Sequence, residues 1–133
     1  MKESKINIVD LLLAQDASKI RDLPTAQIRI TRLSDIIGAD FCLEIRALTG
    51  AEIESMPDGM EGIDRKILTG VKNFDFTDTQ LRGKFTPDGR CTPLTPTELI
   101  DVLLLPGEKI QIVRKINDLS GYTDDAVEVI RKN

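Results

Sequence analysis

The chain has 133 residues, of which 41% are hydrophobic and 30% charged, and its formal net charge is -4. This length and composition are those of one globular domain that can bury a core without help from metals or disulfides. The net charge of -4 and the pI near 4.9 give no electrostatic footprint for nucleic acid or an anionic membrane. Because the sequence contains no histidine, Ser-His-Asp and Cys-His catalytic arrangements are excluded.

The N-terminal region and the two cysteines favour a cytoplasmic protein. The opening apolar run is interrupted by Asn7 and Asp10 and lacks a small-residue cleavage site, unlike a secretory signal. No apolar run approaches the ~20 residues that a membrane helix needs. Cys42 lies in an apolar segment and Cys91 in a Gly/Pro-rich loop, so we expect both to be reduced, the first in the core and the second partly exposed.

A first helix is expected over residues 4–15, with Ser4 as its N-cap. Its apolar residues occupy two faces: Ile6, Val9, Leu12 and Leu13 lie on one, and Ile8 and Leu11 on the other. The second apolar face is either buried between two layers, which we favour, or docks to a partner or a second copy. A polar connector, residues 16–25, follows.

Two segments alternate between apolar and polar residues, as half-buried strands do: residues 27–32 and residues 41–48. We expect them to pair, with a short helical turn between them that Gly38 ends. A third strand is predicted over residues 65–71, although Gly70 weakens it or marks a bulge. The sequence therefore predicts an α+β fold, in which a small, mainly antiparallel sheet of about three strands is covered by N-terminal and C-terminal helices.

Local signals place helices between and after these strands. Thr49 as N-cap and Glu52 at N3 begin one helix, and a shorter one is expected over residues 77–81. Residues 83–95 are rich in Gly and Pro and should form a loop with a small hairpin. We treat residues 1–133 as a single domain.

The C-terminal part carries the clearest signals. Thr95, Pro96 and Glu98 predict a capped helix from residue 96, whose apolar residues up to Leu105 surround it and favour burial on most sides. Pro106 should stop that helix and begin another. Its apolar stripe contains Ile112, Val113, Ile116 and Leu119, and Ser120 and Gly121 should end it. Thr123, Asp124 and Asp125 are expected to cap a last short helix that turns Ala126, Val127 and Ile130 inward.

No catalytic, cofactor-binding or metal-binding residue is assigned. The acidic clusters in residues 75–78 and 124–128 lack the pattern of a calcium loop, and helix capping explains them better. Arg29, Arg32 and Arg46 could line one strand face as an anion patch, but a solvated sheet face is the better interpretation.

Several segments, taken in order, resemble the tail assembly chaperones of PBSX-type prophages, the XkdN-like family. Three segments of the first half carry the resemblance: Asn-Ile-Val-Asp-Leu-Leu-Leu at 7–13, Ile-Thr-Arg-Leu-Ser at 30–34, and Arg-Ala-Leu-Thr with Glu52 after it at 46–52. Two segments of the second half also carry it: Leu-Leu-Leu-Pro-Gly-Glu at 103–108 and Leu-Ser-Gly-Tyr at 119–122. It covers nearly the whole chain. Lys109 departs from the apolar residue expected after Pro-Gly-Glu, so this helix start should be more exposed here.

The resemblance implies a non-catalytic protein that binds the tape measure protein and keeps it soluble during tail tube assembly. It also implies a location in the host bacterial cytoplasm and absence from the mature particle. The tail tube protein and a second copy of the chain are further partners left open; no cofactor, nucleic acid or membrane is expected. A structural tail subunit or a generic protein-interaction adaptor is the alternative, and a small carboxylate-dependent enzyme is a remote one.

A chaperone of this kind needs exposed apolar surface for a helical client. The candidate partner-binding residues are Ile8 and Leu11 on the first helix, and Ile110 and Tyr122 in the C-terminal part.

Overall fold

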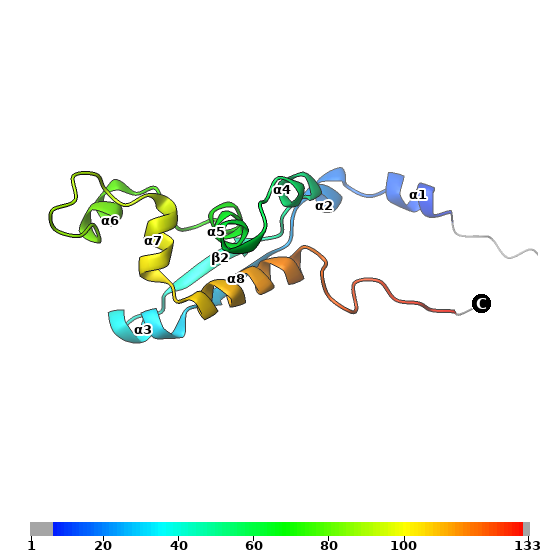
Figure 1. The fold of residues 1–133 in the computed structure, drawn as a ribbon. Coiled ribbons are helices and arrows are strands. Elements are labelled where there is room, and N and C mark those ends of the chain that lie inside the picture. The colour runs from blue at the N-terminus through cyan, green and yellow to red at the C-terminus, as the bar shows by residue number, and fades with distance from the viewer. Residues whose placement is uncertain (1–6, 132–133) are drawn as a thin grey trace, which may run out of the picture.

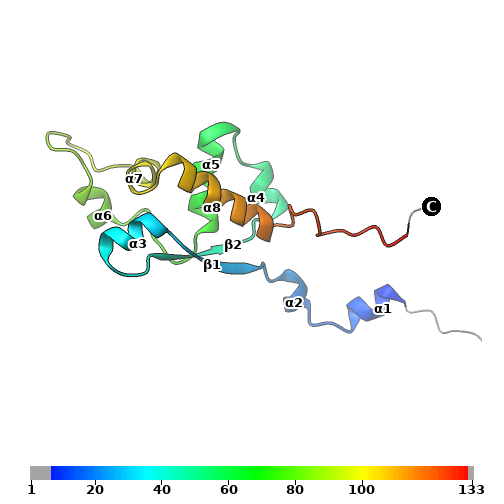
Figure 2. The same ribbon diagram turned by 90° about the horizontal axis from the view of Figure 1, so that it is seen from below.

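The computed structural model describes residues 7–131, and in this part of the chain a two-stranded sheet packs against helices (Figures 1 and 2). The expected α+β class is confirmed. The elements in chain order are α1 (Ile8–Leu13), α2 (Ala17–Arg21), β1 (Thr25–Arg29), α3 (Thr31–Ile37), β2 (Cys42–Arg46), α4 (Gly50–Glu54), α5 (Gly59–Gly70), α6 (Thr79–Lys84), α7 (Pro96–Leu103) and α8 (Pro106–Leu119).

The predicted pairing of the first two strands is confirmed. β1 and β2 are antiparallel, with Thr25 opposite Arg46 and Arg29 opposite Cys42. Leu43 and Ile45 point into the core, so alternation along the strand turns Cys42 to the solvent side. The expectation that Cys42 is a core residue is therefore wrong, while Cys91 is exposed in its loop.

The third predicted strand is wrong, because residues 65–70 belong to the helix α5. Ile63 and Ile67 recur at helical spacing, and Ile67 is fully buried against α8. Of residues 65–71, Val71 alone pairs with the sheet, through an isolated bridge to Ile45. Gly70 marks a close approach of two helices instead of a bulge: a Cβ atom there would lie 2.7 Å from Cδ1 of Ile116.

The two predicted C-terminal helices are confirmed, with one correction. Thr95 and Glu98 form the expected capping box, and Pro106 begins α8. α7 ends at Leu103 and leaves Val102 and Leu105 half exposed, so burial on most sides is wrong for this helix. The buried side of α8 consists of Lys109, Ile112, Val113 and Ile116.

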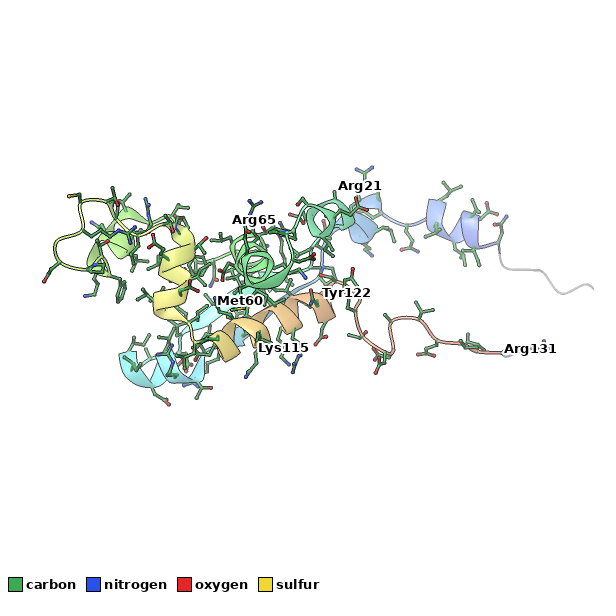
Figure 3. The ribbon with its side chains drawn as sticks, in the orientation of Figure 1. Arg21, Met60, Arg65, Lys115, Tyr122 and Arg131 are labelled. Atoms are coloured by element: carbon green, nitrogen blue, oxygen red, sulfur yellow. The ribbon has the colours of Figure 1, made fainter. Side chains whose placement is uncertain are left out.

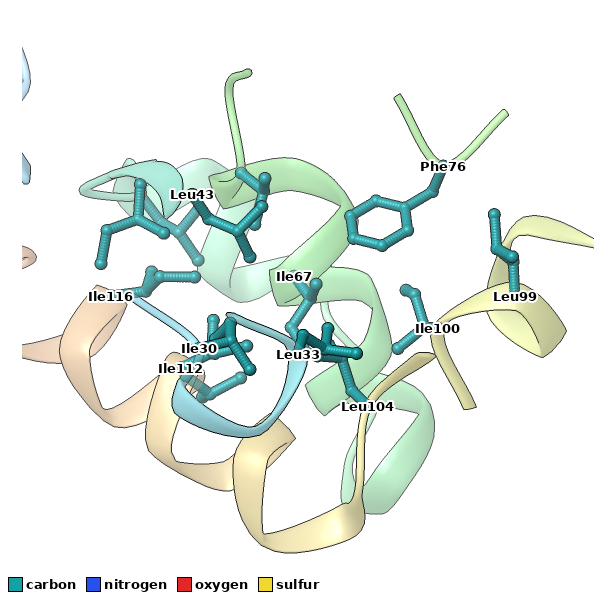
Figure 4. Close-up of a cluster of buried hydrophobic side chains, with 14 residues drawn as sticks. Ile30, Leu33, Leu43, Ile67, Phe76, Leu99, Ile100, Leu104, Ile112 and Ile116 are labelled. Atoms are coloured by element: carbon teal, nitrogen blue, oxygen red, sulfur yellow. The ribbon is translucent and has the colours of Figure 1, made fainter. Parts of the chain in front are cut away.

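Buried side chains from the sheet, α3, α5, α7 and α8 meet in one core (Figure 4). Its fully buried large residues are Leu43, Ile45, Ile67, Leu99, Ile100, Ile112 and Ile116. These residues come from four separate elements, and only two of them lie on the sheet. The sheet is therefore too small to form the core alone, and α5 and α8 supply much of it.

Both ends of the described chain project away from this core on the same side (Figures 1 and 2). α1 is capped by Asn7, whose side chain accepts from the Val9 amide; the proposed N-cap Ser4 lies outside the described residues. α2 occupies the segment expected to be a connector, capped by Asp16. Neither helix has a buried residue, so the favoured burial of the first helix between two layers is wrong.

The predicted last helix is also wrong, because residues 123–131 contain no helix and are exposed. Val127 and Ile130 are 84% and 95% exposed, so nothing covers the side chains that were expected to turn inward. A segment this short gains too little from helix formation without a packing surface. Residues 83 and 84 belong to α6, and no strand forms in residues 85–95, which the structure describes fully, so the expected small hairpin is absent.

No helix within residues 7–131 combines the length and the apolar character needed to cross a bilayer.

We predict that Ile116→Ala lowers the free energy of unfolding by ~2–5 kcal/mol, the usual cost of truncating a fully buried isoleucine. Leu103→Ala should cost less, because Leu103 is only partly buried beside the core. Urea unfolding of both variants measures the two values. A loss below ~0.5 kcal/mol for Ile116→Ala would contradict the placement of α8 in the core.

Candidate partner-binding surfaces

The acidic clusters do not form a metal site. Within the described residues no group of three or more Asp, Glu or Cys side chains is arranged to hold a metal ion. Asp75 accepts from the backbone amide and hydroxyl of Thr77, and Asp78 caps α6, as capping predicted. Asp124 and Asp125 cap no helix, so that explanation is wrong for the second cluster.

The three arginines considered as an anion patch are each bound to a different carboxylate. Arg29 pairs with Asp40 at 2.8 Å, and Arg46 pairs with Glu52 at 2.7 Å. Arg32 pairs with Glu108. They therefore act separately within the fold and do not present one anion-binding face.

The pair formed by Arg32 and Glu108 joins α3 to the corner between α7 and α8. The Arg32 guanidinium donates to both Glu108 oxygens, at 2.9 and 3.2 Å, and to the carbonyl of Leu103 at 2.7 Å. Glu108 also accepts from the Leu105 amide at 2.7 Å, which caps α8. These bonds, led by the one from Arg32, hold the pKa of Glu108 below its ordinary value.

Two serines make similar connections. Ser34 donates to the Ile30 carbonyl and accepts from the Phe41 amide, which ties α3 to the start of β2. Ser120 donates to the Ile116 carbonyl and accepts from the Leu48 amide, which ties the end of α8 to the segment after β2. Four of the five segments that carried the family resemblance thus hold the fold together, whereas segment 7–13 lies in the exposed helix α1.

The burial of Lys109 is the opposite of what its sequence context suggested. The expectation of an exposed helix start is wrong, because Lys109 is only 3% exposed. Its ammonium group lies 3.0 Å from Asp64 on α5 and 2.5 Å from Asp101 on α7. Burial acts to lower the pKa of Lys109, but the hydrogen bonds to both aspartates outweigh it, so the net direction is upward.

A groove of about 550 Å³ lies between α8 and the segment formed by β1 and α3. Its apolar lining is Ile28, Ile30, Leu105 and Ile112. Its polar and charged lining is Arg29, Thr31, Arg32, Asp35, Glu108, Gln111 and Lys115. No local pattern in the sequence indicates this groove, because its two walls come from residues at least 70 positions apart that meet only in the fold.

The N-terminal arm, which we define as residues 7–22, presents the second apolar surface. Figure 3 shows that its side chains stand away from the folded body. Exposed apolar residues of the arm are Ile8, Val9, Leu11, Leu12, Leu13 and Ile20. Leu12, Leu13, Ala17 and Ile20 contribute to a shallow hollow of about 410 Å³ between α1 and α2.

The four candidate residues are all accessible, but they do not form one surface. Ile8 and Leu11 lie on the arm and are 71% and 53% exposed. Ile110 lies in the first half of α8, and Tyr122 follows α8 at the start of the C-terminal segment (Figure 3). Exposed residues that the sequence did not single out include Ile36 and Ile37 on α3, together with Val129 near the C-terminus.

The described chain is a small, mainly helical body with exposed apolar side chains on its N-terminal arm and near its C-terminus. Such exposed apolar surface is suited to binding other proteins. The family model for phage XkdN-like tail assembly chaperone proteins matches residues 58–132, and the chain belongs to this family. No curated protein and no solved structure matches it.

We predict that Lys109→Ala lowers the free energy of unfolding by ~3–5 kcal/mol, because it leaves the buried carboxylate of Asp64 without its cation. The double variant Lys109→Met/Asp64→Leu removes both buried charges and should recover most of this loss. Urea unfolding measures both variants. A Lys109→Ala protein as stable as the wild type would mean that this ammonium group is solvated.

We predict that the pair of Arg46 and Glu52 makes stability sensitive to acid. The Arg46 hydrogen bond, followed by the Thr49 amide, lowers the pKa of Glu52 from 4.5 to about 2. Because the folded-state pKa is depressed, the stabilisation is fully present above pH 4.5 and is lost as the pH falls toward 2. After discounting for solvent screening it is about 1 kcal/mol. Glu52→Gln should therefore lower stability at pH 7 and flatten its decline between these pH values, as measured by urea unfolding.

Proposed function

We propose that this protein binds the tape measure protein and keeps it soluble until tail tube subunits replace it. Family membership supports a role in tail assembly, and the observation that carries the client-binding proposal is the N-terminal arm, which has no buried residue. We place this activity in the host bacterial cytoplasm and expect the protein to be absent from the finished particle.

The arm has the chemistry that a helical client requires. α1 consists of Ile-Val-Asp-Leu-Leu-Leu, five apolar residues around a single acid. An amphipathic client helix would cover these side chains and be covered by them, which removes apolar surface of both partners from water. Because the contact is mainly apolar, the complex should persist at moderate salt, where exposed ion pairs weaken.

We predict that co-expression with this chain raises the soluble fraction of the tape measure protein, and that Ile8→Asp/Leu11→Asp abolishes the gain. Both positions are exposed, so circular dichroism and urea unfolding of the variant should match the wild type. The matched control is Ile36→Asp/Ile37→Asp, two exposed isoleucines on α3, which should retain the gain.

Equal insolubility of the tape measure protein with and without the wild-type chain would contradict the proposal. Mass spectrometry of mature particles addresses the alternative, because a structural subunit would be present in them and a chaperone absent.

A further inference from the structure

The two edges of the sheet differ. The outer edge of β2 is covered: the Lys72 amide donates to the Glu44 carbonyl at 2.7 Å, and the Asn73 side chain binds the Glu44 amide and the Cys42 carbonyl. The segment after α5 therefore satisfies the backbone groups on this side. Among residues 7–131, no comparable segment is hydrogen-bonded along the outer edge of β1.

The register shows which β1 groups are left open. Ile30 donates to Phe41 and Ala47 donates to Pro24, so the even-numbered residues of this segment make the ladder bonds to β2. The amide and carbonyl groups of Thr25, Gln27 and Arg29 consequently point to the outer edge. They make no hydrogen bond with any residue between 7 and 131, and all three residues are exposed. An open edge of this kind is a template for another strand.

The same chain carries a segment that matches this edge. The C-terminal tail, defined here as residues 122–131, is exposed and has neither helix nor strand of its own. Val127, Val129 and Ile130 are β-branched residues, the type that favours strands, and they are 78% to 95% exposed. In an added strand Val127 and Val129 fall on one face, and Glu128 falls on the other.

The groove beside β1 fits these two faces. Ile28 and Ile30 form part of its apolar lining, on the side of β1 that faces the core, so two valines of an added strand would lie over them. Glu128 would then lie on the same side as Arg29. Tail residues 123–131 contain three acids and one base, a formal charge of -2, whereas Lys115 on the groove wall makes no ion pair with any described residue.

We propose that the C-terminal tail of a second copy of this chain adds as a strand to the open edge of β1. In both views the tail leaves α8 and runs away from its own body, so it would have to reverse its path to reach its own β1 (Figures 1 and 2). Copies joined in this way associate through backbone hydrogen bonds and two valines. This inference does not depend on the identity of the client.

The test uses the full chain and two variants that affect opposite halves of the contact. Gln27→Pro removes the central outward amide of β1 but no ladder bond to β2. Val127→Asp/Val129→Asp places carboxylates on two exposed tail positions, where the fold does not depend on them. Val102→Asp, an exposed valine on α7, is the matched control.

Light scattering after size exclusion should give the wild type and the control a mass above that of one chain, rising with concentration. Each variant alone should have the mass of one chain. An equal mixture of the two variants should regain a species with one copy of each, because one supplies an intact tail and the other an intact edge. Hydrogen exchange should show slowed exchange of the Thr25, Gln27 and Arg29 amides only in associated samples.

Other occupants give different results, and each would overturn the proposal. If a chain's own tail covers β1, these amides are protected in a wild type that remains a single chain at every concentration. If a client strand occupies the edge, they are protected only when the tape measure protein is present. A mixture that fails to regain the joint species, or a tail variant that still associates, would equally reject the proposal, while a loss of client solubilisation alone would leave it standing.

Discussion

The burial of one side of α8 is the interaction on which the rest of the structure depends. A two-stranded sheet is marginally stable alone, and here its inner face becomes part of a core only because Ile112 and Ile116 lie against it and against α5. The close approach at Gly70 brings the α5 backbone next to Ile116, so a larger residue there would force the Ile116 side chain to shift. Without α8 the sheet and α5 would each lose a main packing partner of their apolar sides.

Polar contacts then fix how the other elements meet this core. Arg32 and Glu108 hold the corner between α7 and α8 against α3, and Lys109 holds α5 and α7 together from inside. A buried ion pair adds little net stability compared with apolar residues of the same shape, but it is very unfavourable when one partner is missing. We infer that Lys109 and Asp64 contribute mainly to the choice of one helix arrangement, since a shifted α8 would leave both charges buried and unpaired.

The sequence predicted the features that depend on local chemistry. Thr49 and Thr95 cap their helices as expected, Gly38 and Gly121 end theirs with positive φ, and the alternation of residues 41–48 identified the buried face of β2. Features decided by tertiary contacts were missed. The short apolar run containing Ile67 suits a strand as well as a helix, and only its packing on α8 decides between them. Likewise, the groove and the partners of Lys109 join distant segments, so no local pattern could reveal them.

The N-terminal arm and the C-terminal tail are not buried by the core. α1 and α2 have six and five residues, lengths at which an isolated helix is marginal in water, so a partner that binds them must also stabilise their conformation. Part of the favourable energy of the apolar contact is therefore used in ordering the arm, and the net affinity is lower than the apolar area alone would give. The proposed function requires such a balance, because a chaperone that covers apolar surface of its client must still be released when the final partner arrives.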